Sequence, residues 1–251
     1  MTSEVGAAST GVRDLVSGPA RRGRVVGVHG SCAYVLVGAD LVALETADAL
    51  GLPCAVRLGV DRSRAPLAAV RRDDEGRVGD GVLRAGPVTV RVTRWWAPRL
   101  PRRGSPGERL TELAALLAEH PCPVDADASV EGLVGLGPGL TPAGDDVLAG
   151  LLVGLHHHPA LRDPLAAEVT ALAPARTNAL SAALLRHAAA GHSVPAVADV
   201  ADALAGHRSD LPAAVARLVA VGHSSGTALA HGLLRAARTV AARGTGEEAV
   251  A

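Results

Sequence analysis

The residues best suited to chemistry are two adjacent carboxylates that close a glycine-rich stretch. The stretch reads GLGPGLTPAGDD over residues 135–146 and ends with Asp145 and Asp146. Glycine and proline together favour a rigid loop with positive-φ positions. Thr141 followed by Pro142 is typical of a capped helix start, with Pro142 at the first helical position. Both carboxylates would then lie in the first helical turn, where they complement the helix dipole.

Several kinds of chemistry fit this arrangement, and an ordinary capped helix start fits it as well. Free N–H groups ahead of the helix could bind a phosphate, although two carboxylates in the same turn repel an anion. The carboxylates could instead serve as metal ligands, as a general base, or as acceptors for the N–H groups of a carbamoyl or amide substrate. A divalent cation such as Mg²⁺ would reconcile carboxylates with a phosphate.

A second polar loop, GHSSGT, spans residues 222–227. It fits the Gly-x-Ser-x-Gly pattern of a nucleophile elbow, but the residues before it have a helical pattern rather than that of a strand. No aspartate follows it, and only His231 is available downstream as a base. We therefore expect a helix–helix junction, with Gly222 as C-cap and Ser224 or Ser225 as N-cap. Its hydroxyls could still bind an oxyanion.

Two further groups of polar residues have ordinary structural explanations. Thr177 and Ser181 lie on one face of a predicted helix that ends near Gly191, with the only asparagine of the sequence between them. A polar helix start explains this pair as well as a binding site does. Three consecutive histidines at 156–158 precede a proline, so we expect them to end a helix rather than to bind a metal.

The elements that must position these residues divide the chain into two parts. Short valine-rich runs separated by glycine and aspartate indicate strands joined by tight turns. The runs cover residues 25–28, 33–37, 41–44, 53–58 and 88–92. Most gaps are too short for helices, so an antiparallel sheet or small barrel is expected. Leucine- and alanine-rich helical stripes follow the Pro- and Arg-rich segment around residues 95–107.

The predicted fold class is therefore α+β, with a β-rich N-terminal part and an all-helical C-terminal part. The expected boundaries are a flexible arm at 1–22, the β-rich part at 23–95, a linker at 96–107 and a helical domain at 108–245. Helices are expected to begin at Pro195 and Pro212 and to end at Gly206 and Gly222.

Composition excludes several classes of protein. The chain has 251 residues, a net charge of +0 and 1% aromatic residues, so it offers neither a basic field nor base-stacking surfaces for nucleic acid. It contains no lysine, which excludes Schiff-base and P-loop chemistry. Its cysteines are scattered, and it has no signal-like or membrane-spanning apolar run. A cytoplasmic protein that binds neither membranes nor nucleic acid is expected.

Taken together, the stretch GLGPGLTPAGDDVLAG at 135–150 and the loop GHSSGT at 222–227 resemble the AllH family. That family includes a subunit of oxamate carbamoyltransferase from allantoin and purine catabolism. The resemblance covers about residues 25–240 and is weak over the β-rich part. It implies transfer of a carbamoyl group between oxalurate and phosphate by a subunit that acts with partner proteins. Ala228 departs from the family pattern, which often has an aspartate at that position.

The resulting hypothesis is a subunit of a carbamoyltransferase that handles a small carbamoyl or ureido acid and phosphate. The string PART at 174–177 lacks the serine of the ordinary carbamoyltransferase phosphate loop, and the chain has no glutamine, so a different kind of site is expected. The alternative is a non-catalytic subunit that binds a small anion or serves assembly. Asp145 and Asp146 are the predicted catalytic residues and the only candidate metal ligands. The predicted substrate-binding residues are Gly137, Gly139, Thr141, Gly144, Thr177, Ser181, Ser224, Ser225, Gly226 and Thr227.

Overall fold

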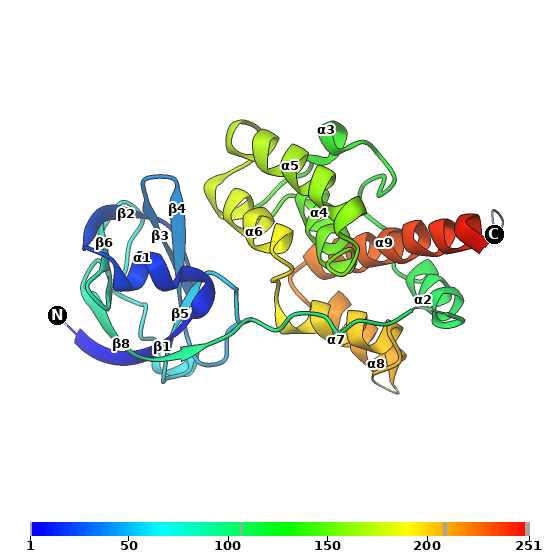
Figure 1. The fold of residues 1–251 in the computed structure, drawn as a ribbon. Coiled ribbons are helices and arrows are strands. Elements are labelled where there is room, and N and C mark those ends of the chain that lie inside the picture. The colour runs from blue at the N-terminus through cyan, green and yellow to red at the C-terminus, as the bar shows by residue number, and fades with distance from the viewer. Residues whose placement is uncertain (1, 106, 208–209, 249–251) are drawn as a thin grey trace. The chain divides into compact units, whose positions relative to one another are not determined.

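The computed structural model describes residues 2–105, 107–207 and 210–248 of the chain. The chain divides into two units, one up to Pro98 and one from Arg99 onward (Figure 1). The first unit is built of strands and the second of helices, so the α+β prediction is confirmed.

The strands of the first unit form a closed barrel in the order β1-β5-β4-β3-β2-β6-β7-β8. Most neighbours are antiparallel, but β4 and β5 are parallel, and so are β1 and β8, whose pairing closes the barrel. Valine and leucine side chains fill its core, including Val35, Leu44, Val56 and Leu83. The strands are β1 (Thr2–Ser9), β2 (Arg21–His29), β3 (Cys32–Val37), β4 (Asp40–Glu45), β5 (Ala55–Leu58), β6 (Glu75–Gly79), β7 (Val82–Ala85) and β8 (Val88–Trp96).

The prediction of a flexible arm at residues 1–22 is wrong. Thr2–Ser9 is strand β1, which pairs with both β5 and β8. A short 3₁₀ turn and the helix α1 (Arg13–Ser17) follow it, and β2 begins at Arg21. Small and polar residues gave β1 no clear alternation of apolar and polar positions, but tertiary pairing makes it a strand all the same.

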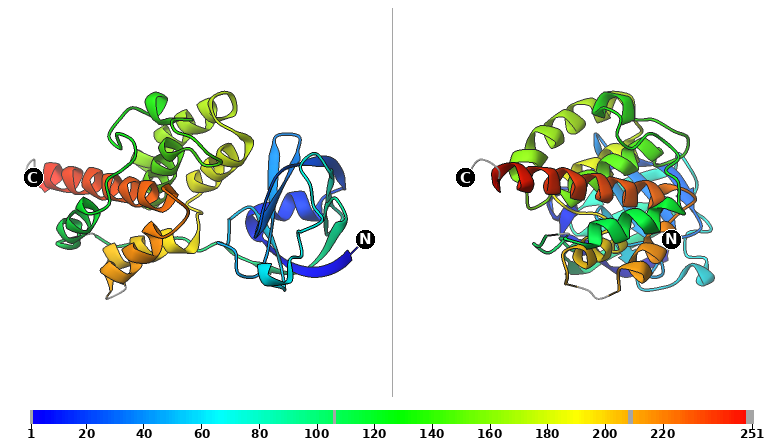
Figure 2. Two further views of the ribbon diagram at one scale, coloured as in Figure 1. Left: turned by 180° about the vertical axis from the view of Figure 1, so that it is seen from behind. Right: turned by 90° about the vertical axis from the view of Figure 1, so that its right-hand side faces the viewer.

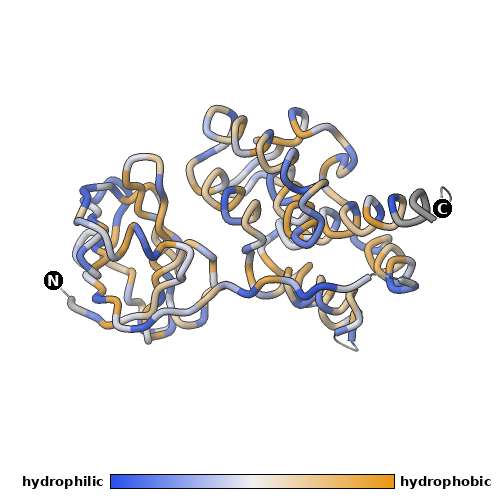
Figure 3. Tube along the Cα trace, in the orientation of Figure 1, coloured by the Kyte–Doolittle hydropathy of each residue, from blue (hydrophilic) through white to orange (hydrophobic). Residues whose placement is uncertain are grey.

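The second unit is helical from residue 109 onward. Its helices are α2 (Arg109–Ala118), α3 (Val130–Leu133), α4 (Ala143–Gly154), α5 (Pro159–Arg176), α6 (Ala179–Ala189), α7 (Pro195–Leu204), α8 (Leu211–Val219) and α9 (Ser225–Glu248). Helix α4 is buried on all sides from Ala143 to Val153, and its only polar side chains in that stretch are those of Asp145 and Asp146. Helices α3, α5, α6, α7 and α9 all pack against it (Figure 2). Apolar segments lie in both units (Figure 3), and each unit has a core of its own.

Glycine allows α4 and α9 to approach each other closely. A Cβ atom at Gly232 of α9 would lie 2.1 Å from the carbonyl oxygen of Val147 in α4. A Cβ atom at Gly150 of α4 would lie equally close, at 2.1 Å, to the carbonyl oxygen of Leu229. The backbones of α4 and α9 are therefore in direct contact at these glycines, and this contact fixes the position of one helix relative to the other.

The Pro- and Arg-rich segment is not a free linker. Trp96 ends β8, and the first unit continues to Pro98. Within the second unit, Arg99 forms ion pairs with Asp199 and Asp202 of α7. The N–H of Arg102 donates to the same Asp202, whose side chain is buried. The extended segment is thus fixed to α7 by charge.

The three cysteines are free thiols, as their scattered spacing predicts. None of the helices in the described part of the chain combines the length and the hydropathy that a membrane crossing needs.

Candidate functional site

The side chain of Asp145 joins the glycine-rich loop to the junction between α5 and α6. Its Oδ1 atom accepts the N–H of Gly135 at 2.8 Å. Its Oδ2 atom accepts the hydroxyls of Thr177 at 2.5 Å and Ser181 at 2.7 Å. Asp145 is 2% exposed, so these donors replace water as its hydrogen-bond partners. The first and third candidate segments are therefore held together by one carboxylate.

The helix start differs from the prediction in one detail. Asp145 and Asp146 lie in the first turn of α4, as expected, but Pro142 occupies the N-cap position and Thr141 makes no capping bond. The Thr141 hydroxyl instead contacts the Ser225 hydroxyl at 2.9 Å. Because Ser225 begins α9, this contact joins the glycine-rich loop to the second polar loop.

Thr177 and Ser181 meet at Asp145, although they do not share a helical face. Thr177 is the C-cap of α5, whereas Ser181 lies in the first turn of α6. Asn178 stands between the two helices and caps α6 by accepting the N–H groups of Leu180 and Ser181, both at 3.1 Å. Its Nδ2 atom also donates to the carbonyl oxygen of Leu140 at 2.9 Å. This bridging role was not predicted, although Asn178 stands out as the only asparagine.

Close backbone approach explains a glycine in this cluster. Gly135 has a φ of +77°, and a Cβ atom there would lie 2.1 Å from the carbonyl oxygen of Arg176. A side chain at residue 135 would therefore push the loop away from the α5–α6 junction that Asp145 holds.

Asp146 differs from Asp145 in its hydrogen bonding. It is also buried, at 7% exposed, but its Oδ2 atom has no hydrogen-bond partner among the described residues. The pKa of Asp146 is raised to about 7, chiefly by burial and to a smaller extent by the charge of Asp145, against the lowering effect of the hydroxyls of Ser225 and Thr141. A carboxyl with a pKa near neutrality can both release and accept a proton under ordinary conditions.

The exposed part of the glycine-rich loop offers free N–H groups. Gly137 and Gly139 have φ values of +111° and +100°. No partner for the N–H groups of Gly137, Gly139, Leu140 and Thr141 is found within the described chain. By contrast, the N–H of Gly144 is used, because it donates to the carbonyl oxygen of Leu136 at 2.9 Å. The loop therefore presents donors for an anion immediately before the helix that carries Asp146.

The second polar loop is a helix–helix junction, as predicted, because it follows helix α8 and not a strand. The prediction that Gly222 is the C-cap is wrong, since α8 ends at Val219 with Ala220 as its C-cap, and Gly222, with a φ of +64°, lies two residues further along. Ser224 directly precedes α9, and its carbonyl oxygen accepts the N–H of Ala228 at 3.0 Å. The N–H of Gly226 donates to the carbonyl oxygen of Val221 at 2.9 Å. Of the predicted binding residues in this loop, Ser225 contacts the first loop through its hydroxyl, and Thr227 is half-buried.

Residues 133–237 match the family model of oxamate carbamoyltransferase subunit AllH. The resemblance predicted from the motifs is thereby confirmed over a segment that contains all three polar segments. No curated protein and no solved structure matches the chain.

Within the segment that matches the family model, the donor set does not favour a Mg²⁺ site between the two aspartates. Both oxygens of Asp145 already accept hydrogen bonds from the chain, which leaves one free oxygen on Asp146. Magnesium prefers several oxygen ligands in octahedral geometry. Among the described residues, no three His, Cys, Asp or Glu side chains are grouped so that they could hold a metal ion.

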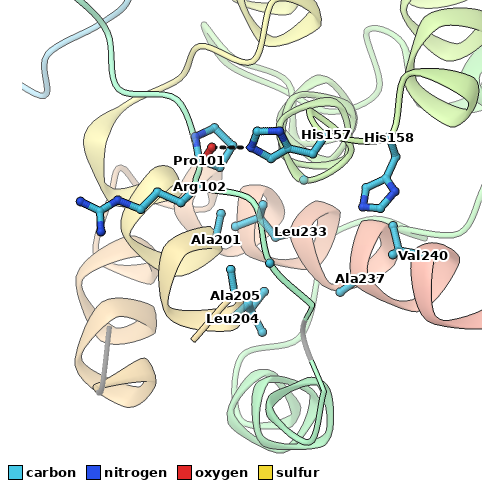
Figure 4. Close-up of a pocket in the computed structure, with 12 residues that line it drawn as sticks. Pro101, Arg102, His157, His158, Ala201, Leu204, Ala205, Leu233, Ala237 and Val240 are labelled. Carbon is cyan, nitrogen blue, oxygen red and sulfur yellow. Dashed lines mark hydrogen bonds between the residues drawn. The ribbon is translucent and has the colours of Figure 1, made fainter. Parts of the chain in front are cut away.

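The three consecutive histidines at 156–158 lie beyond the end of α4, as predicted. The Nε2 atom of His157 forms a hydrogen bond of 2.8 Å with the carbonyl oxygen of Pro101 (Figure 4). His157 and His158 line a small cavity of about 60 Å³, together with residues of the 101–104 segment, α7 and α9. The His157 contact holds the extended segment against the helices, which is a structural role.

Proposed function

We propose that the chain is a subunit of a carbamoyltransferase that transfers a carbamoyl group between oxalurate and phosphate. The observation that carries the proposal is Asp146. A buried carboxyl with a free oxygen and a pKa of about 7 lies beside two hydroxyls and a donor-rich loop, inside the segment that matches AllH. The family match supplies the reaction class. In this proposal the enzyme is cytoplasmic and belongs to allantoin and purine catabolism.

Asp146 acts as the general acid in the direction of oxalurate cleavage. A phosphate oxygen attacks the ureido carbonyl carbon, and the bond from that carbon to the oxamate nitrogen breaks. The leaving nitrogen takes the proton of Asp146, and the attacking hydrogen phosphate loses its own proton, which returns to Asp146. The products are oxamate and carbamoyl phosphate. In the reverse direction the Asp146 carboxylate removes a proton from the oxamate nitrogen as it attacks carbamoyl phosphate. A pKa near neutrality suits both directions.

The other residues of the cluster bind and position. The free N–H groups of residues 137 and 139–141 bind the phosphate or its carbamoyl ester. Thr141 and Ser225 orient the carboxyl of Asp146 through their hydroxyls. Asp145 holds the loop and the α5–α6 junction in place and does not react itself, since its oxygens are already occupied.

The alternative is a non-catalytic subunit that binds a small anion or serves assembly. The contacts of Asp145 favour it, because Gly135, Thr177 and Ser181 all donate inward to this one side chain. A family motif held together in this way can be retained for folding alone.

Activity in the assembled complex separates the two proposals. Carbamoyl phosphate formation from oxalurate and phosphate would be measured with every partner subunit present, for the wild-type chain, Asp146→Asn and Ser224→Ala. Asp146→Asn should lower the rate by about 100-fold or more, as expected for the loss of a general acid. Ser224→Ala should have a small effect, because no acid–His pair activates Ser224 as a nucleophile.

The exposed Glu168 provides the control, since Glu168→Gln changes an acid on the same unit without touching the cluster. If Asp146→Asn assembles and retains the wild-type rate, the catalytic proposal is rejected and the assembly proposal is favoured. If Ser224→Ala has the larger effect, the assignment of Asp146 as the acid is wrong.

A further inference from the structure

The proposed reaction leaves Asn178 without a role, although this residue contacts the glycine-rich loop. Asn178 is the N-cap of α6 and stands between the two helices that Asp145 joins to the loop. Its side chain makes three hydrogen bonds, and two of them serve the start of α6. The third bond reaches Leu140, which lies 38 positions earlier in the chain.

The two capping bonds fix the direction in which the amide group of Asn178 points. The N–H groups of Leu180 and Ser181 both donate to its Oδ1 atom at 3.1 Å. Because a backbone N–H needs an acceptor, the oxygen must face α6 and the NH₂ group must face the other way. The Nδ2 atom therefore faces the loop, where it donates to the carbonyl oxygen of Leu140 at 2.9 Å. A reversed amide would lose all three hydrogen bonds.

The bond to Leu140 determines the direction of a neighbouring N–H group. The carbonyl of Leu140 and the N–H of Thr141 belong to one planar, trans peptide unit, so they point in opposite directions. With the carbonyl oxygen turned toward Asn178, the N–H of Thr141 points away from it and has no partner among the described residues. The hydroxyl of Thr141 is held separately by the hydroxyl of Ser225, at 2.9 Å.

The opposite orientation of this peptide unit would work against an anion. A carbonyl oxygen carries a partial negative charge and can only accept hydrogen bonds. Leu140 is exposed, and its carbonyl oxygen accepts no other hydrogen bond from the described part of the chain. Without the amide of Asn178, the peptide unit is free to turn and to present this oxygen to a phosphate.

We propose that Asn178 is a positioning residue for phosphate, which acts through the peptide unit between Leu140 and Thr141. This inference rests on the proposed function, because it takes the N–H groups of the glycine-rich loop as the phosphate site. Asn178 touches neither the phosphate nor the reacting atoms. It keeps the N–H of Thr141 available as a donor, and so it sets the affinity for phosphate without entering the proton transfer at Asp146.

Asn178→Ser separates this role from helix capping. Serine is as good an N-cap residue as asparagine, so the start of α6 keeps its acceptor. The serine hydroxyl is too short to reach the carbonyl of Leu140 as well, and the substitution adds no charge. With every partner subunit present, the KM for phosphate should rise about tenfold, as expected when one hydrogen bond to a charged group is lost. The kcat, the KM for oxalurate and the midpoint of urea denaturation should stay close to those of the wild type.

Equilibrium dialysis with radiolabelled inorganic phosphate gives the direct measurement on the same complexes. The Kd for phosphate of Asn178→Ser should rise by the same factor as its KM. Asp210→Ser is the matched control, because Asp210 is the N-cap of another helix of the unit, α8, and accepts the N–H of Ala213 at 2.8 Å. This control should leave the Kd, the KM and the kcat unchanged.

The outcomes distinguish this inference from the proposed function. If the wild-type complex binds no phosphate, the proposed function fails and the role of Asn178 fails with it. If the wild type binds phosphate and Asn178→Ser binds it equally well, only the role of Asn178 is rejected. A parallel loss of kcat, of oxalurate affinity and of the denaturation midpoint would also reject it, because that pattern indicates a general structural defect.

Asn178→Asp is the second variant, should Asn178→Ser fail to fold. Aspartate keeps a capping oxygen at the same reach but has no donor for the carbonyl of Leu140. Its Kd for phosphate should rise at least as much as that expected for the serine variant, and an unchanged Kd would overturn the proposal.

Discussion

Replacing Asp146 with asparagine should stabilise the chain above neutral pH and have little effect in acid. The folded protein holds the proton of Asp146 more tightly than the unfolded chain, because burial raises the pKa of this carboxyl from 3.8 to about 7. Between these two pH values the unfolded state is ionised while the folded state is still protonated. The free energy of unfolding therefore falls as pH rises through this window, and above it the folded state carries a buried charge.

The expected size of the effect follows from the shift. A shift of about three pKa units corresponds to about 4 kcal/mol, at 1.36 kcal/mol per unit. Asparagine cannot ionise, so the free energy of unfolding of the variant does not fall with rising pH at this position. Differences in packing or hydrogen bonding between the two side chains are the same at every pH. The change in the difference between variant and wild type, from about pH 4 to about pH 8, is therefore the informative quantity.

Urea denaturation followed by far-UV circular dichroism would measure it at several pH values across this range. The exposed Glu168 again supplies the control, and the curves of Glu168→Gln and wild type should run parallel. A rising advantage of Asp146→Asn up to about 4 kcal/mol at about pH 8 is expected. Parallel curves for Asp146→Asn and wild type would refute the reasoning that Asp146 is a buried, protonated acid near neutrality.

Three further changes probe other parts of the helical unit. Asp145→Ala leaves three inward-pointing donors without their acceptor and should lower the free energy of unfolding by about 3–5 kcal/mol; an unchanged free energy of unfolding would contradict the role of Asp145 in holding the loop to the α5–α6 junction. Gly232→Ala places a Cβ 2.1 Å from the Val147 carbonyl oxygen and should cost about 2 kcal/mol or more, whereas Gly30→Ala, which meets no atom within 4 Å, should be neutral. Burial lowers the pKa of His187 to about 4, so the unfolded state takes up its proton first and stability is lost as pH falls below 6.5. In the same assay, His187→Leu should reduce the fall in the free energy of unfolding below pH 6.5. An unchanged fall would contradict the lowered pKa of His187.

The barrel was predictable where strand residues alternate or form valine-rich runs. The five predicted runs all lie at least partly in strands, from β2 to β8. Strands β1, β6 and β7 were missed, since they are short or rich in small residues and glycine. Their strand character comes from pairing with neighbours, which local sequence does not encode.

The candidate site was predictable as a set of segments but not as a set of roles. Glycine, proline and doubled aspartate identified the loop and the helix start. Asp145 and Asp146 are adjacent in sequence, yet successive side chains on a helix point about 100° apart. One therefore reaches Thr177 at the α5–α6 junction, and the other lies near Ser225 at the start of α9. Only the packing of α4 against its neighbours determines which carboxylate has a free oxygen.

The hydrogen bonds that Asp145 accepts also restrict the order in which parts of the protein can fold. Its donors come from residues 10, 32 and 36 positions away along the chain. The loop cannot be ordered by local contacts alone, because two of these partners arrive only when α5 and α6 have docked onto α4. Closing such long segments costs chain entropy before the hydrogen bonds compensate for it. A nascent or truncated chain that ends before Thr177 would therefore contain the complete glycine-rich motif without its working geometry.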